Sequence, residues 1–150
     1  MTTRDDHTSP EQLGVLIKAA QSVLHQRMDE TLRPLGLSVS QYACLEALHD
    51  SPGITSSELG RRTFVSRQSM NVLLQGLVDK GLVERSTEPG PRRELAATLT
   101  PGTSELLHSA RDRVSVVTQR MTAALDEKQR DQLGAALASC CDALLQTTPA

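Results

Sequence analysis

The chain must build its hydrophobic core almost without aromatic side chains. Its 150 residues include one Tyr, one Phe and no Trp, so the core has to come mostly from Leu, Val and Ala. A core of such small side chains removes little apolar surface from water per residue. Long helices or an interface between two copies would increase the apolar surface that is buried. The spacing of these aliphatic residues is therefore the main guide to the fold.

Length and composition favour one globular domain spanning residues 1–150. Hydrophobic residues make up 38% and charged residues 23%, and the formal net charge is −2, which is typical of a folded chain rather than a disordered one. No apolar run approaches the length of a membrane span. The polar, acidic N-terminus lacks the layout of a signal peptide. These features predict a cytoplasmic protein with no membrane partner.

Cysteine spacing indicates neither a disulfide framework nor a zinc site. The three cysteines are Cys44, Cys140 and Cys141, an odd number without a Cys-x-x-Cys pair. The four histidines show no metal-ligand spacing with one another or with carboxylates. We therefore expect no metal and no cofactor.

Long helices are predicted at both ends of the chain. Apolar residues recur at steps of three and four from Leu13 to Leu32, which predicts a helix over residues 11–34, ended by Pro34 and Gly36. A second helical region is predicted over residues 101–147. Within it, Thr100-Pro101 fits a helix start and residues 126–129 fit a second one, since both carry capping signatures.

The middle of the chain, residues 38–99, has the element order of a winged helix-turn-helix lobe. Ser38 or Ser40 can cap a first helix, and Thr55–Glu58 forms a capping box for a short second helix. Ser66 then caps a longer helix whose inner stripe is Met70, Leu73, Leu74 and Leu77. Strand-like segments at 82–85 and 95–99, joined by a Pro- and Gly-rich turn, follow as a hairpin. The predicted fold class is therefore mainly α.

A basic, hydrogen-bonding patch begins the longer helix of this lobe. In helix-turn-helix modules the N-terminal residues of the second helix meet base edges in the major groove. Arg suits guanine there, and Gln and Asn suit adenine. Arginines at the hairpin tip would reach the backbone or the minor groove. The candidate DNA-contacting residues are Ser56, Arg61, Arg62, Ser66, Arg67, Gln68, Ser69, Asn71, Arg92 and Arg93; the alternative for them is an ordinary solvated surface.

Over residues 32–107 the sequence resembles the MarR (multiple antibiotic resistance regulator) family of bacterial transcription factors. The motifs that carry the resemblance are GLSVSQ at 36–41, PGITSSEL at 52–59, LVDKGLVER at 77–85 and LT at 99–100. The resemblance implies a homodimer held together by the first and last helices, residues 11–34 and 101–147. Two departures stand out: Pro91 replaces an Asp that usually braces the wing, and Gly76 replaces a polar, helix-favouring residue.

Together these features predict a homodimeric, sequence-specific DNA-binding regulator, a repressor relieved by a small ligand. The two-fold axis requires an inverted-repeat site in double-stranded DNA, with half-sites roughly 34–36 Å apart. The resemblance also implies that a small aromatic or phenolic ligand binds between the dimerisation helices and the DNA-binding lobe. Candidate ligand-binding residues are His25, Arg27, His49 and Arg111.

The sequence bears on three other classes of protein. An enzyme is not expected, because the sequence has no Gly-rich phosphate loop, nucleophile elbow or paired carboxylates with a nearby base. A winged-helix module for protein interaction would need no basic residues at the start of its longer helix. An oxidant-sensing regulator would use Cys44, whereas a buried cysteine would simply behave as a small apolar residue.

Overall fold

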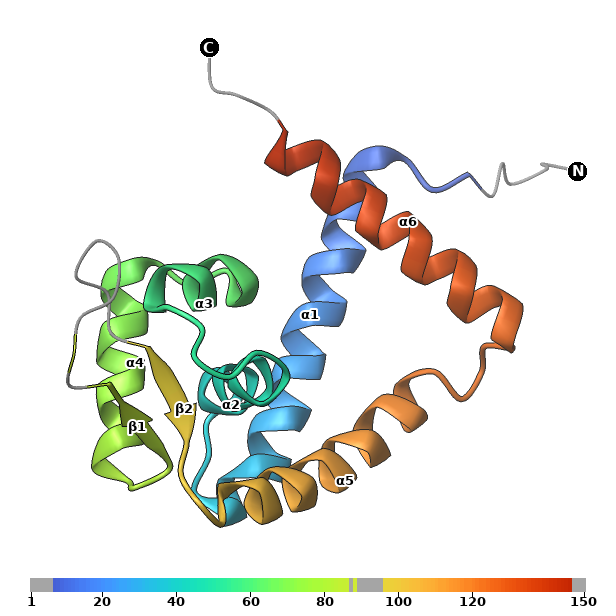
Figure 1. Ribbon diagram of the computed structural model, residues 1–150. Coiled ribbons are helices and arrows are strands. Elements are labelled where there is room, and N and C mark those ends of the chain that lie inside the picture. The colour runs from blue at the N-terminus through green and yellow to red at the C-terminus, as the bar shows by residue number, and fades with distance from the viewer. Residues whose placement is uncertain (1–6, 87, 89–95, 147–150) are drawn as a thin grey trace, which may run out of the picture. The chain divides into compact units, whose positions relative to one another are not determined.

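The computed structural model describes residues 7–86, 88 and 96–146. Helices dominate these residues, and a two-stranded sheet accompanies them (Figure 1). This confirms the predicted fold class. The elements are α1 (Pro10–Leu32), the 3-10 helix η1 (Arg33–Leu35), α2 (Val39–Asp50), α3 (Ser56–Thr63), α4 (Arg67–Asp79), β1 (Val83–Arg85), β2 (Ala97–Leu99), α5 (Thr103–Met121) and α6 (Glu127–Leu145).

The chain divides into two compact units, residues 1–115 and 116–150. The first contains the core, which among the described residues is aliphatic apart from two sulfur-containing side chains, as the scarcity of aromatic residues predicted. Its members are Leu32, Leu37, Cys44, Leu45, Leu48, Ile54, Leu59, Met70, Leu74, Leu77, Val83, Ala97, Leu107, Ala110 and Val114. The second unit holds the end of α5 and the whole of α6.

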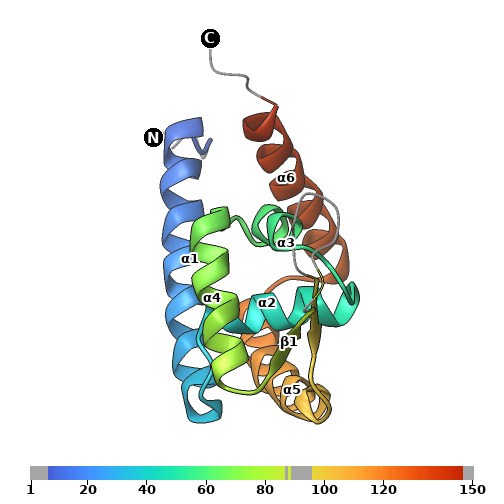
Figure 2. The same ribbon diagram turned by 60° about the vertical axis from the view of Figure 1, so that its left-hand side comes forward.

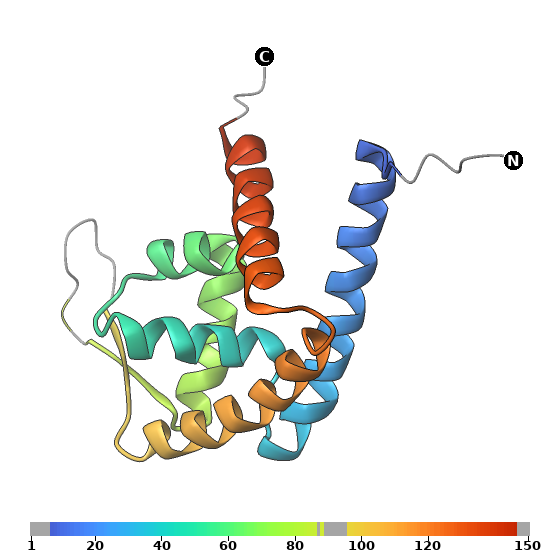
Figure 3. The same ribbon diagram turned by 90° about the vertical axis from the view of Figure 1, so that its right-hand side faces the viewer.

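Helix α2 organises the first unit. It packs against α1, α3, α4 and β2, and it crosses the middle of this unit in two further views (Figure 2 and Figure 3). Leu45 and Leu48 are buried on its inner side, as predicted, while Tyr42 is only half-buried. Among the helices that the structure describes, none is long and apolar enough to cross a membrane.

Side-chain caps start most of these helices, and those of α2, α3, α4 and α6 lie where the sequence predicts. Ser9, Ser38 and Asp126 each accept a hydrogen bond from the third backbone amide of α1, α2 and α6, and the third residue of each helix, a glutamine, bonds back to the cap. Thr55 supplies the first half of the box expected for α3: its Oγ1 accepts from the Glu58 amide at 3.4 Å.

Two predicted boundaries differ from the structure. Helix α5 begins at Thr103 rather than beside Thr100, because Gly102 has a φ of +88° and so turns the chain first. The Thr100 hydroxyl instead donates to the Gly81 carbonyl at 2.7 Å. The strands are also shorter than expected: Val83 pairs with Leu99 and Arg85 with Ala97, and the start of the second predicted strand, Leu95, lies outside the described residues.

Candidate nucleic-acid interface

Helix α4 presents a polar N-terminal edge that its own cap holds in place. Ser66 is the N-cap, with φ −62° and ψ 153°. Its Oγ accepts from the Ser69 amide at 3.2 Å and donates to the Ser69 Oγ at 2.9 Å. The capping contacts fix the first turn of α4, so the residues on that turn are held in a defined direction.

Burial separates the two faces of α4. Met70, Leu74 and Leu77 have no exposed surface, and they anchor the helix to the core. By contrast, the residues predicted to contact DNA along this helix are all exposed: Ser66, Arg67, Gln68, Ser69 and Asn71. No carboxylate lies in the first turn of α4. The edge therefore offers donors and acceptors for base edges, and positive charge for phosphate.

The turn before α4 exposes its aromatic residue and buries part of its aliphatic one. Phe64 adopts the left-handed region at φ +57° and is 76% exposed. Val65 alone of the pair packs against the core. The turn closes tightly, because a Cβ added at Gly60 would lie 2.6 Å from the Val65 carbonyl oxygen.

Helix α3 places its candidate residues in different settings. Arg61 is exposed in the last turn. Arg62 donates to the Ser51 Oγ at 2.8 Å, so it ties the end of α3 to the end of α2. Ser56 is 5% exposed, and its Oγ accepts from the Arg85 guanidinium at 3.0 Å. Any direct contact of Ser56 with a phosphate would therefore require this bond to rearrange.

Arg85 is a residue that the sequence did not single out. Its guanidinium joins β1 to the start of α3, and its Nε is buried without an acceptor among the described residues. A buried donor without a partner carries a cost of about 1–3 kcal/mol. Strand β1 enters the segment that contains Pro91 in place of the family's usual Asp. Arg92 and Arg93, the predicted wing contacts, lie outside the described residues.

The four candidate ligand-binding residues are only partly brought together. The Arg111 guanidinium makes two hydrogen bonds to the Glu46 carboxylate, at 2.5 and 2.8 Å, and approaches the His49 Nδ1 at 3.2 Å. These bonds to Glu46 raise the pKa of Arg111 above its ordinary value. His25 is exposed on α1, and Arg27 pairs with Glu30 at 3.0 Å. The structure thus unites His49 and Arg111, through a contact between α2 and α5.

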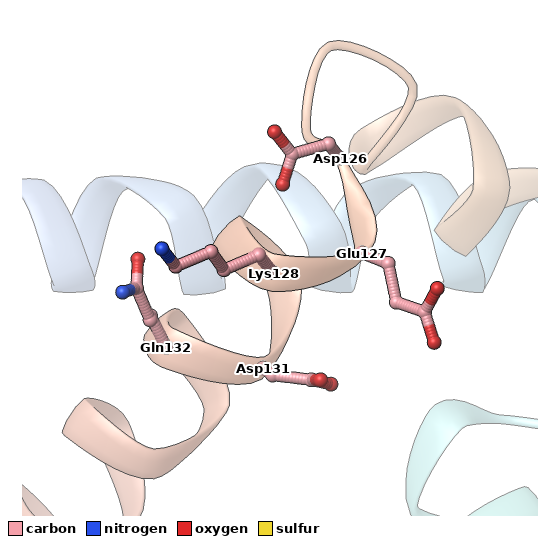
Figure 4. Close-up of a pocket in the computed structure, with 5 residues that line it drawn as sticks. All are labelled: Asp126, Glu127, Lys128, Asp131 and Gln132. Atoms are coloured by element: carbon pink, nitrogen blue, oxygen red, sulfur yellow. The ribbon is translucent and has the colours of Figure 1, made fainter.

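Two surface hollows within the described part of the chain do not include these four residues. One, at the start of α6, is an open depression, where Lys128 and Gln132 extend to one side of the helix and Glu127 and Asp131 to the other (Figure 4). It is lined by Asp126, Glu127, Lys128, Asp131 and Gln132. Another lies along the start of α1, between Thr8 and Leu16. Neither hollow includes His25, Arg27, His49 or Arg111, and neither has an enclosing aromatic wall.

Comparison with known proteins identifies the family. The MarR family model matches residues 35–94, which include α2, α3, α4 and β1. The HTH-type transcriptional repressor Rv2887 of Mycobacterium tuberculosis is 36% identical over 118 residues, which are 79% of this chain and 85% of that protein. The chain belongs to the MarR family. The family is one of transcriptional regulators, which agrees with the sequence-based prediction.

Solved structures of this MarR-family relative agree with the fold. Rv2887 in complex with DNA has a TM-score of 0.69 at 34% identity, covering 85% of this chain and 96% of that chain. Rv2887 in complex with p-aminosalicylic acid has a TM-score of 0.67 at 34% identity, covering 85% of this chain and 97% of that chain. The helix-turn-helix pair α3 and α4 described above is thus part of a MarR-family fold.

Proposed function

We propose that this MarR-family chain is a cytoplasmic, homodimeric repressor that binds an inverted-repeat operator and leaves it when a small aromatic acid binds. The observation that carries the proposal is the division of α4 into a buried aliphatic stripe and an exposed edge. Arg67, Gln68 and Asn71 on that edge have the side chains that suit guanine and adenine in the major groove.

The proposed mechanism places one α4 from each protomer in successive major grooves. Residues 11–34 and 101–147 form the dimerisation region, and residues 38–99 form the DNA-binding lobe. Arg92 and Arg93 contact DNA beside the half-site. A ligand lowers DNA affinity only if it binds more tightly to the dimer arrangement that does not fit the operator than to the arrangement that does. The relative Rv2887 has been solved with DNA and with p-aminosalicylic acid, which supports both parts of the proposal.

Salt dependence tests the DNA contacts. Duplexes selected from genomic fragments by the full-length dimer would be titrated at several salt concentrations. Each lost phosphate contact reduces the slope of log affinity against log salt by about 0.9. Arg67→Ala and Arg93→Ala should weaken binding, and a variant that has lost a phosphate contact should also lower the slope. Lys18→Ala removes one positive charge from exposed α1 and should change neither. A folded dimer that selects no duplex contradicts the proposed function.

Salicylate titration tests the ligand part. Adding salicylate to the dimer–DNA complex should release the duplex, and Arg111→Ala should abolish the release if this guanidinium binds the carboxylate. In the structure Glu46 already occupies that guanidinium, so a bound acid has to compete with it. Glu46→Gln should then increase sensitivity to salicylate. Equal release in wild type and in the His25, Arg27, His49 and Arg111 variants would remove these four residues from the proposal.

A further inference from the structure

An apolar side chain lies in the middle of the exposed face of α4. Val72 is 72% exposed. At 3.6 residues per turn it lies about 200° around the helix from the buried Met70, opposite the stripe that anchors α4. Its neighbours on this face are Gln68, one turn earlier, and Gln75, one turn later; both are exposed. Val72 therefore interrupts a polar surface on the helix that faces DNA in the proposed function.

The fold gains nothing from this valine. Val72 is not among the core residues or among the partly buried residues that pack on the core, whereas Leu73 and Val78 on the same helix are. A β-branched residue on a helix surface is also less favourable than Ala, by about 0.5 kcal/mol. Isolated exposed apolar residues are common. This one is set apart by its place between Gln68 and Gln75, on the face of α4 opposite the core.

The major groove contains one apolar group among its base edges, the C5 methyl of thymine. We propose that Val72 packs against a thymine methyl, and so makes thymine a required base at one position of each half-site. This inference rests on the proposed function and adds a specificity-determining residue to it. Val72 lies four residues beyond Gln68, or about 6 Å along the helix. With base pairs about 3.4 Å apart, its thymine lies within about two base pairs of the base that Gln68 contacts.

The chemistry of valine favours this partner over the other bases. Its χ1 is nearly fixed in a helix, so the two methyl groups are already in place before binding. The amino group of cytosine or the acceptors of guanine at the same position would face an apolar surface and lose their water without gaining a hydrogen bond. Val72 would therefore both attract thymine and disfavour a G·C pair.

Deoxyuridine substitution isolates the methyl group. A duplex selected by the wild-type dimer is resynthesised with deoxyuridine in place of one thymidine at a time, and its affinity is measured for each version. We expect one position in each half-site where loss of the methyl weakens wild-type binding about three- to tenfold. Val72→Ala should bind the thymidine duplex correspondingly more weakly and should show no further loss on the deoxyuridine duplex, because the two changes remove the same contact.

Matched variants separate this contact from its neighbours. Gln68→Ala should weaken binding yet keep the deoxyuridine effect at the Val72 position. Since Val72 is exposed and Ala is the better helix former, Val72→Ala should melt at or slightly above the wild-type temperature, which a thermal scan checks. In one outcome, the wild type selects a duplex, and deoxyuridine weakens the binding of Val72→Ala by the same factor as that of the wild type at every thymidine position. That result overturns this inference and leaves the proposed function standing. A wild-type dimer that selects no duplex overturns the proposed function, and this inference with it.

Discussion

Cys44 shows how burial decides the chemistry of a single residue. Its side chain has no exposed surface, and its Sγ lies 4.0 Å from the Met70 Sδ. Burial raises the pKa of Cys44 to about 12, so almost no thiolate forms at neutral pH, and the thiolate is the reactive species. This argues against the alternative in which Cys44 senses oxidants. The residue contributes to the core as a small apolar side chain.

The free energy of unfolding at alkaline pH should report the ionisation of this buried thiol. The pKa of Cys44 rises from 9.0 to about 12 on folding, so the unfolded chain loses its proton first. The contribution to the free energy of unfolding is complete below pH 9 and is lost as pH rises to about 12; it is on the order of 4 kcal/mol. Urea titrations across this pH range measure it.

The matched variant for this prediction is Cys44→Ala. Its stability should be lower overall, but should begin to fall only near pH 10, through Tyr42. The pKa of Tyr42 is raised from 10.0 to about 12, mainly by burial and then by the negative charge of Glu46. If the variant and the wild type start to lose stability at the same pH, the assignment to Cys44 is wrong.

At the scale of elements, two glycines in the helix-turn-helix pair have opposite roles. A Cβ added at Gly76 in α4 would meet only the Gln41 Nε2, at an ordinary 3.9 Å. A Cβ added at Gly60 in α3 would overlap the Val65 carbonyl oxygen at 2.6 Å. The same substitution should therefore stabilise one helix and disrupt the packing of the other.

Gly76→Ala should raise the free energy of unfolding by about 1 kcal/mol, because Ala restricts the unfolded chain and favours helix. The open space around Gly76 argues against close packing as the reason for a glycine at this position. Chemical denaturation at neutral pH measures the change. A loss of stability would mean that the backbone of α4 needs Gly at this position.

Gly60→Ala should lower the free energy of unfolding by about 1–3 kcal/mol, because a backbone oxygen has to move to admit the methyl group. The displaced segment leads directly into Ser66 and the exposed edge of α4, so affinity for a selected duplex should fall as well. Denaturation and duplex titration are both needed. Wild-type values in both measurements would show that the turn can relax freely.

The sequence predicted the elements well, because their signals are local. Ser38 and Ser66 cap the helices expected of them. What it missed depends on residues far apart in the chain. Glu46 and Arg111 are 65 positions apart, and Ser56 and Arg85 are 29 apart. No periodicity or capping rule relates such positions, so the burial of Ser56 could not be foreseen.

For the whole molecule, the helices near the two ends of the chain expose apolar side chains. Among the described residues, α1 exposes Leu13, Leu16 and Val23, and α6 exposes Leu133, Leu137, Leu144 and Leu145, all between 39% and 79%. Both helices belong to the segments proposed for dimerisation. Burial of these side chains between two copies would supply the apolar contact that the small core lacks.

Leu16→Glu should therefore weaken dimerisation, because it places a charge in an apolar interface. Sedimentation equilibrium should show a higher dimer dissociation constant, and binding to a selected duplex should weaken in parallel. Lys18→Glu puts a carboxylate on an exposed position of the same helix and serves as the control. An unchanged dimer in Leu16→Glu would remove this part of α1 from the interface.

The capping boxes of α1 and α2 have a consequence for acid conditions. In both, a serine pairs with a glutamine: Ser9 with Gln12, and Ser38 with Gln41. Neither partner carries a proton that acid can change, whereas the more usual glutamate would lose its charge. The contact between α2 and α5 is of another kind, an ion pair between the Arg111 guanidinium and the Glu46 carboxylate. Acid should therefore leave the first turns of α1 and α2 wound.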